Sequence, residues 1–331
     1  MDTYLYTVQY PVILCCLTFK SVITFIMLLP FKLLAISIVL PCLLFVVHNK
    51  TDRRIYDLER QDKSETEGGY TRAQYMELMH MLAETNMADP NGHNATLVAF
   101  ERLTRSPESI MEIGFGLGHF SILLANKFPH SSVVGIDAHQ LSVDSANTYL
   151  QSLPNPPTNV RFEGRRESEL NEPPKSVDVI TTTLVNHHIF PDEAFVEFLK
   201  RVSVVGRQAF IFNDMHRSLK CKLSNDASLL LMKHVGMSRL RSLLPYLPTY
   251  LTQAAARYAH VFTRPQEVID LFTEGGMLSL RRSFSLSEYE TMFARAGYPP
   301  GALQCQRLDK WHETLDATCR VVCVADLTWS G

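Results

Sequence analysis

Apolar residues dominate the start of the chain. Residues 11–47 are almost continuously apolar, and the stretch 21–47 holds one charged residue, a lysine. That stretch is long enough to cross a bilayer core of about 30 Å. Two lysines and two prolines interrupt the longer run: Lys20, Lys32, Pro30 and Pro41. The pattern predicts a transmembrane segment within residues 1–50. One span and a hairpin around Pro30 both remain open, and a buried hydrophobic hairpin is the alternative.

Basic residues directly after this stretch set its expected orientation. Lys50, Arg53 and Arg54 follow the apolar run, and basic residues favour the cytosolic side of a membrane. We therefore expect a membrane protein whose globular part faces the cytosol. Asn49 and Asn94 each begin a glycosylation sequon, and both should stay unmodified on that side.

Beyond this point strand and helix patterns alternate. Residues 51–69 are polar and predict a linker, which together with two helical patterns fills residues 51–107. These two helices are expected at 71–85 and 97–103. Five apolar runs predict strands at 109–113, 132–136, 160–162, 177–183 and 208–212. Helices are expected between them at 119–128, 141–150 and 192–202, the last with Phe195, Val196, Phe198 and Leu199 on its inner side. The alternation predicts an α/β architecture with a parallel sheet covered on both faces.

The pattern changes after the fifth strand. Residues 227–266 contain five basic residues and no acid, with apolar residues at mostly helical intervals, and predict a helical cap insert over 227–275. Its basic residues are Lys233, Arg239, Arg241, Arg257 and Arg264. A helix at 287–296, ended by Gly297, and two closing strands at 303–308 and 318–327 complete the chain.

The composition of the chain limits which partners and which metal sites are expected. After the first fifty residues the chain carries 29 basic and 33 acidic residues, so a nucleic-acid partner is not expected. Seven cysteines are present: Cys15, Cys16, Cys42, Cys221, Cys305, Cys319 and Cys323. The four-residue offset between Cys319 and Cys323 is not a zinc spacing, and we expect no metal site. We interpret the cysteines as core or surface thiols in a reducing compartment.

A glycine-rich loop is the strongest local signal. Gly114, Gly116 and Gly118 lie between an expected strand and a helix that begins near His119. Glycines allow positive φ and let a ligand lie against bare backbone, and the helix aims free N–H groups at it. Asp137 ends the next expected strand, where a carboxylate can accept hydrogen bonds from two ribose hydroxyls.

The spacing of the glycines and the acid before them, Glu112, distinguish two classes of cofactor. A dinucleotide fold requires the spacing G-x-G-x-x-G, whereas this chain has G-x-G-x-G. Glu112 would repel a pyrophosphate, but it would attract the cationic amino-acid end of S-adenosylmethionine. The sequence therefore favours S-adenosylmethionine over a dinucleotide or an empty glycine turn.

These motifs resemble those of class I S-adenosylmethionine-dependent methyltransferases over residues 108–327. The resemblance rests on Glu112-Ile-Gly-Phe-Gly-Leu-Gly118, on Val134-Gly-Ile-Asp137 and on the strand 177–183 with His187-His188 after it. It implies a Rossmann-like doubly wound sheet of seven strands, the last antiparallel, over a methyltransferase domain at 108–331. By the same resemblance, Glu112 and the three glycines hold the methionine part of the cofactor, and Asp137 holds the ribose. Arg165 departs from the pattern, because it stands where the family usually has an acid that contacts the adenine amino group.

Residues after the fourth and fifth strands are the candidates for catalysis. Open α/β sheets bind ligands at the carboxyl ends of their strands, and an imidazole can take a hydroxyl proton near neutral pH. We expect His188, with Asp214 or His216, to act on the methyl acceptor; a histidine that only packs is the alternative. Arg217 and Arg281-Arg282 are further candidates, for an anionic acceptor.

The basic insert is the clue to the acceptor. Its Lys and Arg side chains could touch lipid head groups and admit a lipophilic molecule, or the insert could be an ordinary cap. We expect a methyltransferase that acts on a small, lipophilic or membrane-associated acceptor, with oxygen favoured as the acceptor atom. The alternatives are a catalytically silent methyltransferase-like subunit of a membrane complex and an NAD-dependent oxidoreductase.

Overall fold

The computed structural model describes residues 71–89, 91–218, 221, 261, 264–308 and 319–329. The chain divides into two units, Met1–Thr51 and Asp52–Gly331, and every described residue belongs to the second. The predicted membrane segment, the linker and most of the basic insert lie outside the described residues. Within the described ranges, the structure contains no helix that is long and apolar enough to cross a membrane.

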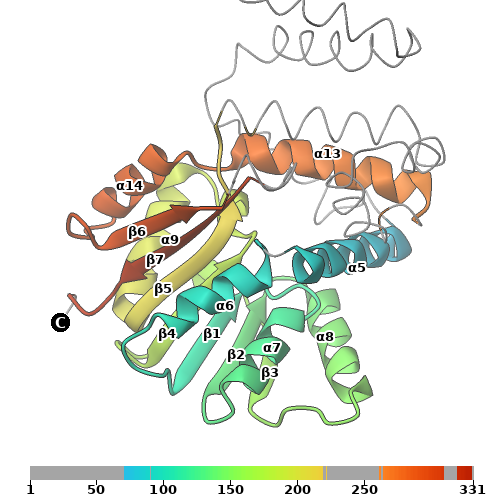
Figure 1. Cartoon of the computed structure of the whole chain (residues 1–331), viewed down its shortest axis with the longest axis horizontal. Coiled ribbons are helices and arrows are strands. Elements are labelled where there is room, and N and C mark those ends of the chain that lie inside the picture. Colours follow the sequence, from blue (N-terminus) through green and yellow to red (C-terminus); the bar gives the residue numbers. More distant parts are fainter. Residues whose placement is uncertain are drawn as a thin grey trace, which may run out of the picture. The chain divides into compact units, whose positions relative to one another are not determined.

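A seven-stranded sheet forms the centre of the second unit, in the order β3-β2-β1-β4-β5-β7-β6 (Figure 1). Its strands are β1 (Ser109–Ile113), β2 (Ser132–Asp137), β3 (Val160–Gly164), β4 (Val177–Thr183), β5 (Gly206–Met215), β6 (Leu303–Arg307) and β7 (Arg320–Asp326). Strands β1 to β5 run parallel, and β7 pairs antiparallel with both β5 and β6. The predicted seven-stranded sheet with an antiparallel last strand is confirmed.

Helices cover both faces of this sheet, as the alternating pattern predicted. One face packs against α6 (His93–Glu101) and α7 (His119–Lys127), with α8 (Gln140–Ser152) beside them. The other face packs against α9 (Asp192–Val205) and α14 (Leu286–Arg295). Side chains of β1 alternate between the faces, so that Ile110 faces α7 and Met111 faces α9. The arrangement is Rossmann-like and doubly wound.

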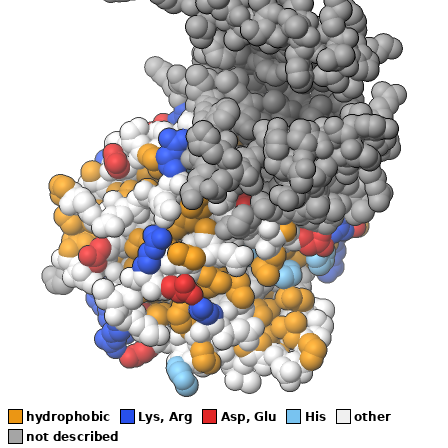
Figure 2. Space-filling model, in the orientation of Figure 1, with side chains coloured by type: hydrophobic (Ala, Val, Ile, Leu, Met, Phe, Trp, Pro, Cys, Tyr) orange, Lys and Arg blue, Asp and Glu red, His pale blue; other side chains and the backbone are white. Residues whose placement is uncertain are grey.

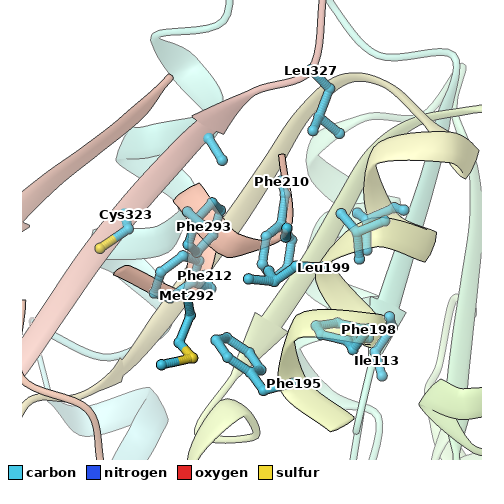
Figure 3. Close-up of a cluster of buried hydrophobic side chains, with 14 of the residues drawn as sticks. Ile113, Phe195, Phe198, Leu199, Phe210, Phe212, Met292, Phe293, Cys323 and Leu327 are labelled. Carbon is cyan, nitrogen blue, oxygen red and sulfur yellow. The ribbon is translucent and has the colours of Figure 1, made fainter. Parts of the chain in front are cut away.

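Aromatic side chains fill the core between the sheet and α9. The predicted inner residues of α9, Phe195, Val196, Phe198 and Leu199, are all buried. Figure 3 shows Phe195 and Phe198 of this helix pointing toward Phe210 and Phe212 of β5, with Phe293 of α14 closing the cluster. The ring centroids of Phe293 and Phe212 are 5.9 Å apart. This packing fixes α14 against the sheet.

A further pair of helices lies outside these layers. Helix α5 (Arg72–Ala88) begins with a capping box formed by Thr71 and Gln74, and it packs against α13 (Gln266–Arg282) (Figure 1). Sequence patterns predicted α5 but not α13. Gly275 and Gly276 lie in the middle of α13, and glycine lowers helix propensity by about 1 kcal/mol, which hides the helical pattern. The helix also continues past residue 275, where the insert was expected to end.

Four cysteines differ from the expectation of free thiols. Cys221 is bonded to Cys319, and Cys305 is bonded to Cys323, its direct partner across the β6–β7 pair. The thiol interpretation is therefore wrong for these four residues. Sequence could not pair them, because Cys221 and Cys319 are 98 positions apart and only the sheet order brings their strand ends together.

Charges of both signs are interspersed on the described surface. Figure 2 shows Lys and Arg side chains lying among Asp and Glu side chains over the described part of this face. The mixture agrees with the near balance of basic and acidic residues in the sequence.

The aromatic core yields a prediction about stability. Phe293→Ala should lower the free energy of unfolding by about 3–5 kcal/mol, since it removes a buried ring and leaves a cavity. Urea denaturation of the full-length protein in detergent measures the loss. The control is Val204→Ala on α9, where the side chain is 51% exposed and the expected change is under about 0.5 kcal/mol. Equal effects of the two substitutions would contradict the packing of α14 on the sheet.

Candidate active site

The glycine loop joins the end of β1 to the first residue of α7. Gly114, Gly116 and Gly118 have φ values of +72°, +58° and +78°, a backbone region that residues other than glycine rarely adopt. A Cβ atom at Gly114 would lie 2.4 Å from Cγ2 of Val185, and one at Gly118 would lie 2.7 Å from Cζ of Phe162. These two glycines are required by the packing of the loop itself.

Gly116 is different, because a Cβ there would meet one atom only, Cε of Met79 at 2.9 Å. Met79 belongs to α5, which therefore lies over the loop. Tyr75 of the same helix lies beside His139, with ring centroids 6.0 Å apart. From the sequence, α5 is expected outside the methyltransferase domain, so its contact with the glycine loop is not predicted. The bare backbone at Gly116 beneath a flexible side chain fits a ligand laid along the loop.

Asp137 connects the loop to the end of β2. Its Oδ2 accepts a hydrogen bond from the backbone N–H of Gly116 at 3.0 Å, and its Oδ1 accepts one from that of His139 at 2.9 Å. Burial raises the pKa of Asp137, and these backbone hydrogen bonds oppose the shift only in part. A carboxylate has about four acceptor sites, so these two backbone hydrogen bonds leave capacity for the predicted contact with a ribose.

Glu112 is buried within β1, with 2% of its surface exposed. The Ser121 hydroxyl of α7 donates a hydrogen bond to its Oε2. Burial raises the pKa of Glu112 to about 7; the Ser121 hydrogen bond opposes the rise and the charge of Asp137 adds to it. A buried carboxyl group next to a ligand loop suits a cationic ligand, since a nearby positive charge stabilises the ionised form.

Arg165 is neutralised by neighbouring acids. Its guanidinium pairs with Glu172 at 2.5 Å and with Glu163 at 3.2 Å, and its backbone N–H donates to the carbonyl oxygen of Asp137 at 2.9 Å. The departure from the family pattern thus leaves the end of β3 balanced in charge. The group that would contact the adenine amino group stays a prediction, with Glu167 as one candidate.

The structure brings two of the predicted catalytic candidates, His188 and Asp214, close to His187 at the ends of β4 and β5. Asp214 Oδ1 lies 2.7 Å from Nδ1 of His187, and Asp214 Oδ2 accepts the backbone N–H of His187 at 3.1 Å. The rings of His187 and His188 are 4.1 Å apart between centroids. Asp214 therefore contacts His187 directly and approaches His188 only through that ring.

Asp214 is fully buried, yet it stays ionised. Burial alone would raise its pKa, but the charge and hydrogen bond of His187, together with the N–H of Met215, outweigh burial and hold the pKa below its ordinary value. His187 is buried as well, whereas His188 is partly exposed. His188 is thus the more accessible residue of the two, although its Nδ1 atom is buried.

The remaining candidates lie in structural positions. His216 is buried, and its Nε2 lies 3.6 Å from Sγ of Cys221 in the first disulfide. Arg217 is buried too; its Nε donates to the carbonyl oxygen of Ser283 at 3.1 Å, and it pairs with Glu288. This pair ties the exit of β5 to the start of α14, so Arg217 is not a free cation for an acceptor. Arg282 lies 6.0 Å above the ring of Phe190.

Comparison with known proteins agrees with this geometry. Residues 110–208 match a family model described as a methyltransferase domain, and this span runs from β1 into β5. None of the curated protein sequences matches the chain. The matched span contains the glycine loop, Glu112 and Asp137, and with them it defines the class: the protein is a methyltransferase, and its cofactor is S-adenosylmethionine.

Three solved structures with similar folds are distant in sequence. YcgJ from Bacillus subtilis is 20% identical, with 66% of this chain and 72% of that chain covered and a TM-score of 0.41. Human N-acetylserotonin methyltransferase in complex with SAM is 14% identical over 77% of this chain and 56% of that chain, with a TM-score of 0.44. A Haloferax volcanii methyltransferase, described as putative and bound to the activator Trm112, is 12% identical over 78% and 99%, with a TM-score of 0.46.

The buried carboxyl group at Glu112 yields a prediction about pH. The ammonium group of the cofactor favours ionised Glu112, whose pKa is about 7 before binding. S-adenosylhomocysteine should therefore bind about 10-fold more weakly at pH 6 than at pH 8, because Glu112 must first lose a proton at the lower pH. Calorimetry at the two pH values measures the ratio. Glu112→Gln should bind weakly at both pH values, and a variant that kept the 10-fold ratio would assign the titration to another group.

Proposed function

We propose that this enzyme methylates an oxygen atom of a small hydroxylated acceptor and that His188 is the general base. The observation that carries the proposal is the buried Asp214–His187 pair beside the partly exposed ring of His188. The cofactor supplies an electrophilic methyl group on its sulfonium. Transfer to a hydroxyl then requires a group that holds the acceptor proton, whereas transfer to a neutral amine does not.

Three side chains divide this work. Ionised Asp214 accepts the Nδ1–H of His187 and fixes the orientation of that buried ring. The ring of His187 packs against His188 and limits its rotation. His188 is the member of the group that an acceptor can reach, and an imidazole titrates in the range that suits a phenol or an activated hydroxyl. Asp214 and His187 act in this proposal as positioning residues, and His216, held against Cys221, takes no part in proton transfer.

Removal of the base should affect chemistry rather than cofactor binding. His188→Asn should lower kcat by about 10²- to 10⁴-fold on a hydroxylated acceptor, with the affinity for S-adenosylhomocysteine unchanged within about 2-fold. Transfer of a labelled methyl group to a panel of lipophilic phenols and alcohols measures the loss. His130→Asn, at an exposed position after α7, is the matched control. Full activity of His188→Asn toward every acceptor in the panel would remove the base from the proposal.

We further propose that the acceptor is lipophilic and that the enzyme is anchored in a membrane. The apolar stretch 21–47 supports the anchor, and the basic insert supports a contact with lipid head groups. Arg264 is withdrawn from that contact, since it pairs with Glu77 at 2.6 Å and with Glu84 at 2.8 Å on α5. The proposal therefore rests on four basic residues: Lys233, Arg239, Arg241 and Arg257.

The side of the membrane is a separate part of the proposal. Lys50, Arg53 and Arg54 favour the cytosol, whereas disulfides such as Cys221–Cys319 form mainly in oxidising compartments. We propose the cytosolic side, on the basis of the flanking charges.

Glycosylation at Asn94 would show directly on which side of the membrane the domain lies. Asn94 is exposed on α6 and begins a sequon. In microsomes or cells that glycosylate, the full-length protein should show no endoglycosidase-sensitive shift. A shift that disappears in the control Asn94→Gln would place the domain on the lumenal side and would overturn the cytosolic orientation.

A further inference from the structure

Arg264 joins helix α5 to the start of α13. Its Nη1 lies 2.6 Å from Oε2 of Glu77, and its Nη2 lies 2.8 Å from Oε1 of Glu84. The two glutamates are seven positions apart on α5, so they lie on one face of the helix, about two turns from each other. The side chain of Arg264 is 18% exposed, and partly buried ion pairs are screened less than exposed ones.

Apolar side chains reinforce this contact on the same face of α5. Met81 lies between the two glutamates and is fully buried against Val261 and Val268. Arg264 comes between these two valines in the sequence, and its backbone N–H donates to the carbonyl oxygen of Val261 at 3.3 Å. The outer face of α5, which carries Glu77, Met81 and Glu84, is therefore held by α13 and by the residue directly before its N-cap.

The inner face of α5 carries Tyr75 and Met79 and points toward the cofactor site. These two side chains lie about half a helical turn away from the two glutamates. Met79 lies over Gly116, and the ring of Tyr75 lies beside His139, two residues after Asp137. Helix α5 thus lies over the glycine loop and over the end of β2.

Polar contacts between the inner face and α8 are long. Oη of Tyr75 lies 3.5 Å from Oγ of Ser142, and Oγ of Ser145 lies 3.5 Å from Sδ of Met76. Figure 1 shows α5 between α13 and α8. The ion pairs on the outer face are shorter and carry full charges, so Arg264 contributes more to the position of α5 than these two contacts do.

The carboxylate of Glu84 also acts on the end of the glycine loop. His119 is the first residue of α7, directly after Gly118. Burial lowers the pKa of His119, the charge of His80 adds to this shift, and the charge of Glu84 opposes it. Glu84 is thus within electrostatic reach of the residue that follows the loop, while it pairs with Arg264 on the other side.

Both the loop and the helix keep surface that a ligand can cover. Gly114 and Gly116 are partly exposed, and so are Tyr75 and Met79 above them. A cofactor that lies along the loop beside Asp137 would therefore touch α5 with its other side. The inner face of α5 has the place of an outer wall for the cofactor site.

We propose that Arg264 is a positioning residue for S-adenosylmethionine. It holds α5 over the glycine loop, so that Tyr75 and Met79 cover the bound cofactor. A protein whose α5 is in place for only part of the time binds the cofactor with an affinity reduced by that fraction. The inference deepens the cofactor assignment, and it is independent of the acceptor and of His188.

Removal of the guanidinium tests this role. Arg264→Met loses both ion pairs, and it should weaken the binding of S-adenosylhomocysteine to the full-length protein in detergent by about 3- to 10-fold. Arg264→Lys should recover part of the loss, because an ammonium group is a point charge without the fork that spans two carboxylates. Calorimetry measures the affinities, and an unchanged affinity of Arg264→Met would overturn the proposal.

Arg207→Met separates cofactor binding from general stability. Arg207 pairs with Asp178 at 2.5 Å where β4 and β5 begin, at the opposite end of these strands from the glycine loop. Asp178 is fully buried, so this control should lose more stability than Arg264→Met and still bind S-adenosylhomocysteine within about 2-fold of the parent. An equal loss of affinity in the two variants would mean that binding follows stability, against the proposal.

Hydrogen exchange locates the effect within the fold. In Arg264→Met the amides of α5 should exchange faster than in the parent, while those of β1 and β4 keep their rates. S-adenosylhomocysteine should slow the exchange of α5 in both proteins, since it contacts the inner face. Weaker binding without faster exchange of α5 would contradict the proposal, and so would faster exchange in all three elements. The acceptor is absent from these experiments, so neither result bears on the role of His188.

Discussion

The hydrogen bond between the N–H of Gly116 and the carboxylate of Asp137 is the constraint on which the site depends. It fixes the middle of the glycine loop to the end of the neighbouring strand β2. The loop can approach that carboxylate because its three glycines adopt positive φ, and because β1 and β2 end at the same edge of the sheet. The shape of the loop thereby depends on the carboxyl group that is predicted to bind the ribose.

Local patterns in the sequence were sufficient for the parallel half of the sheet. The runs at 109–113 and 177–183 coincide with β1 and β4, since strands buried on both faces consist largely of apolar and β-branched residues. The glycine loop was equally visible, because positive φ restricts the residue type. By contrast, α13 was missed, because Gly275 and Gly276 weaken its pattern although tertiary contacts with α5 stabilise it.

Pairings between distant segments could not be predicted from sequence. The sequence proposed His188 and Asp214 as candidates, but the buried contact of Asp214 is with His187, and only the geometry of the turn after β4 decides between the two histidines. Arg217 was expected to bind an anionic acceptor, but it pairs with Glu288, because α14 packs beside the end of β5. The glycine loop carries its own signature, whereas an arginine does not reveal from its neighbours in sequence whether it lies in solvent or beneath a helix.

Met79 has a consequence for turnover. Its terminal methyl group occupies the space beside Gly116, and α5 is held to Arg264 by two ion pairs. A ligand that enters this space meets an unbranched side chain with three rotatable bonds, which can move aside without breaking either ion pair. Space beside Gly116 can therefore open through a rotamer change of Met79, on the nanosecond scale of side-chain motion, without the slower opening of a helix pair.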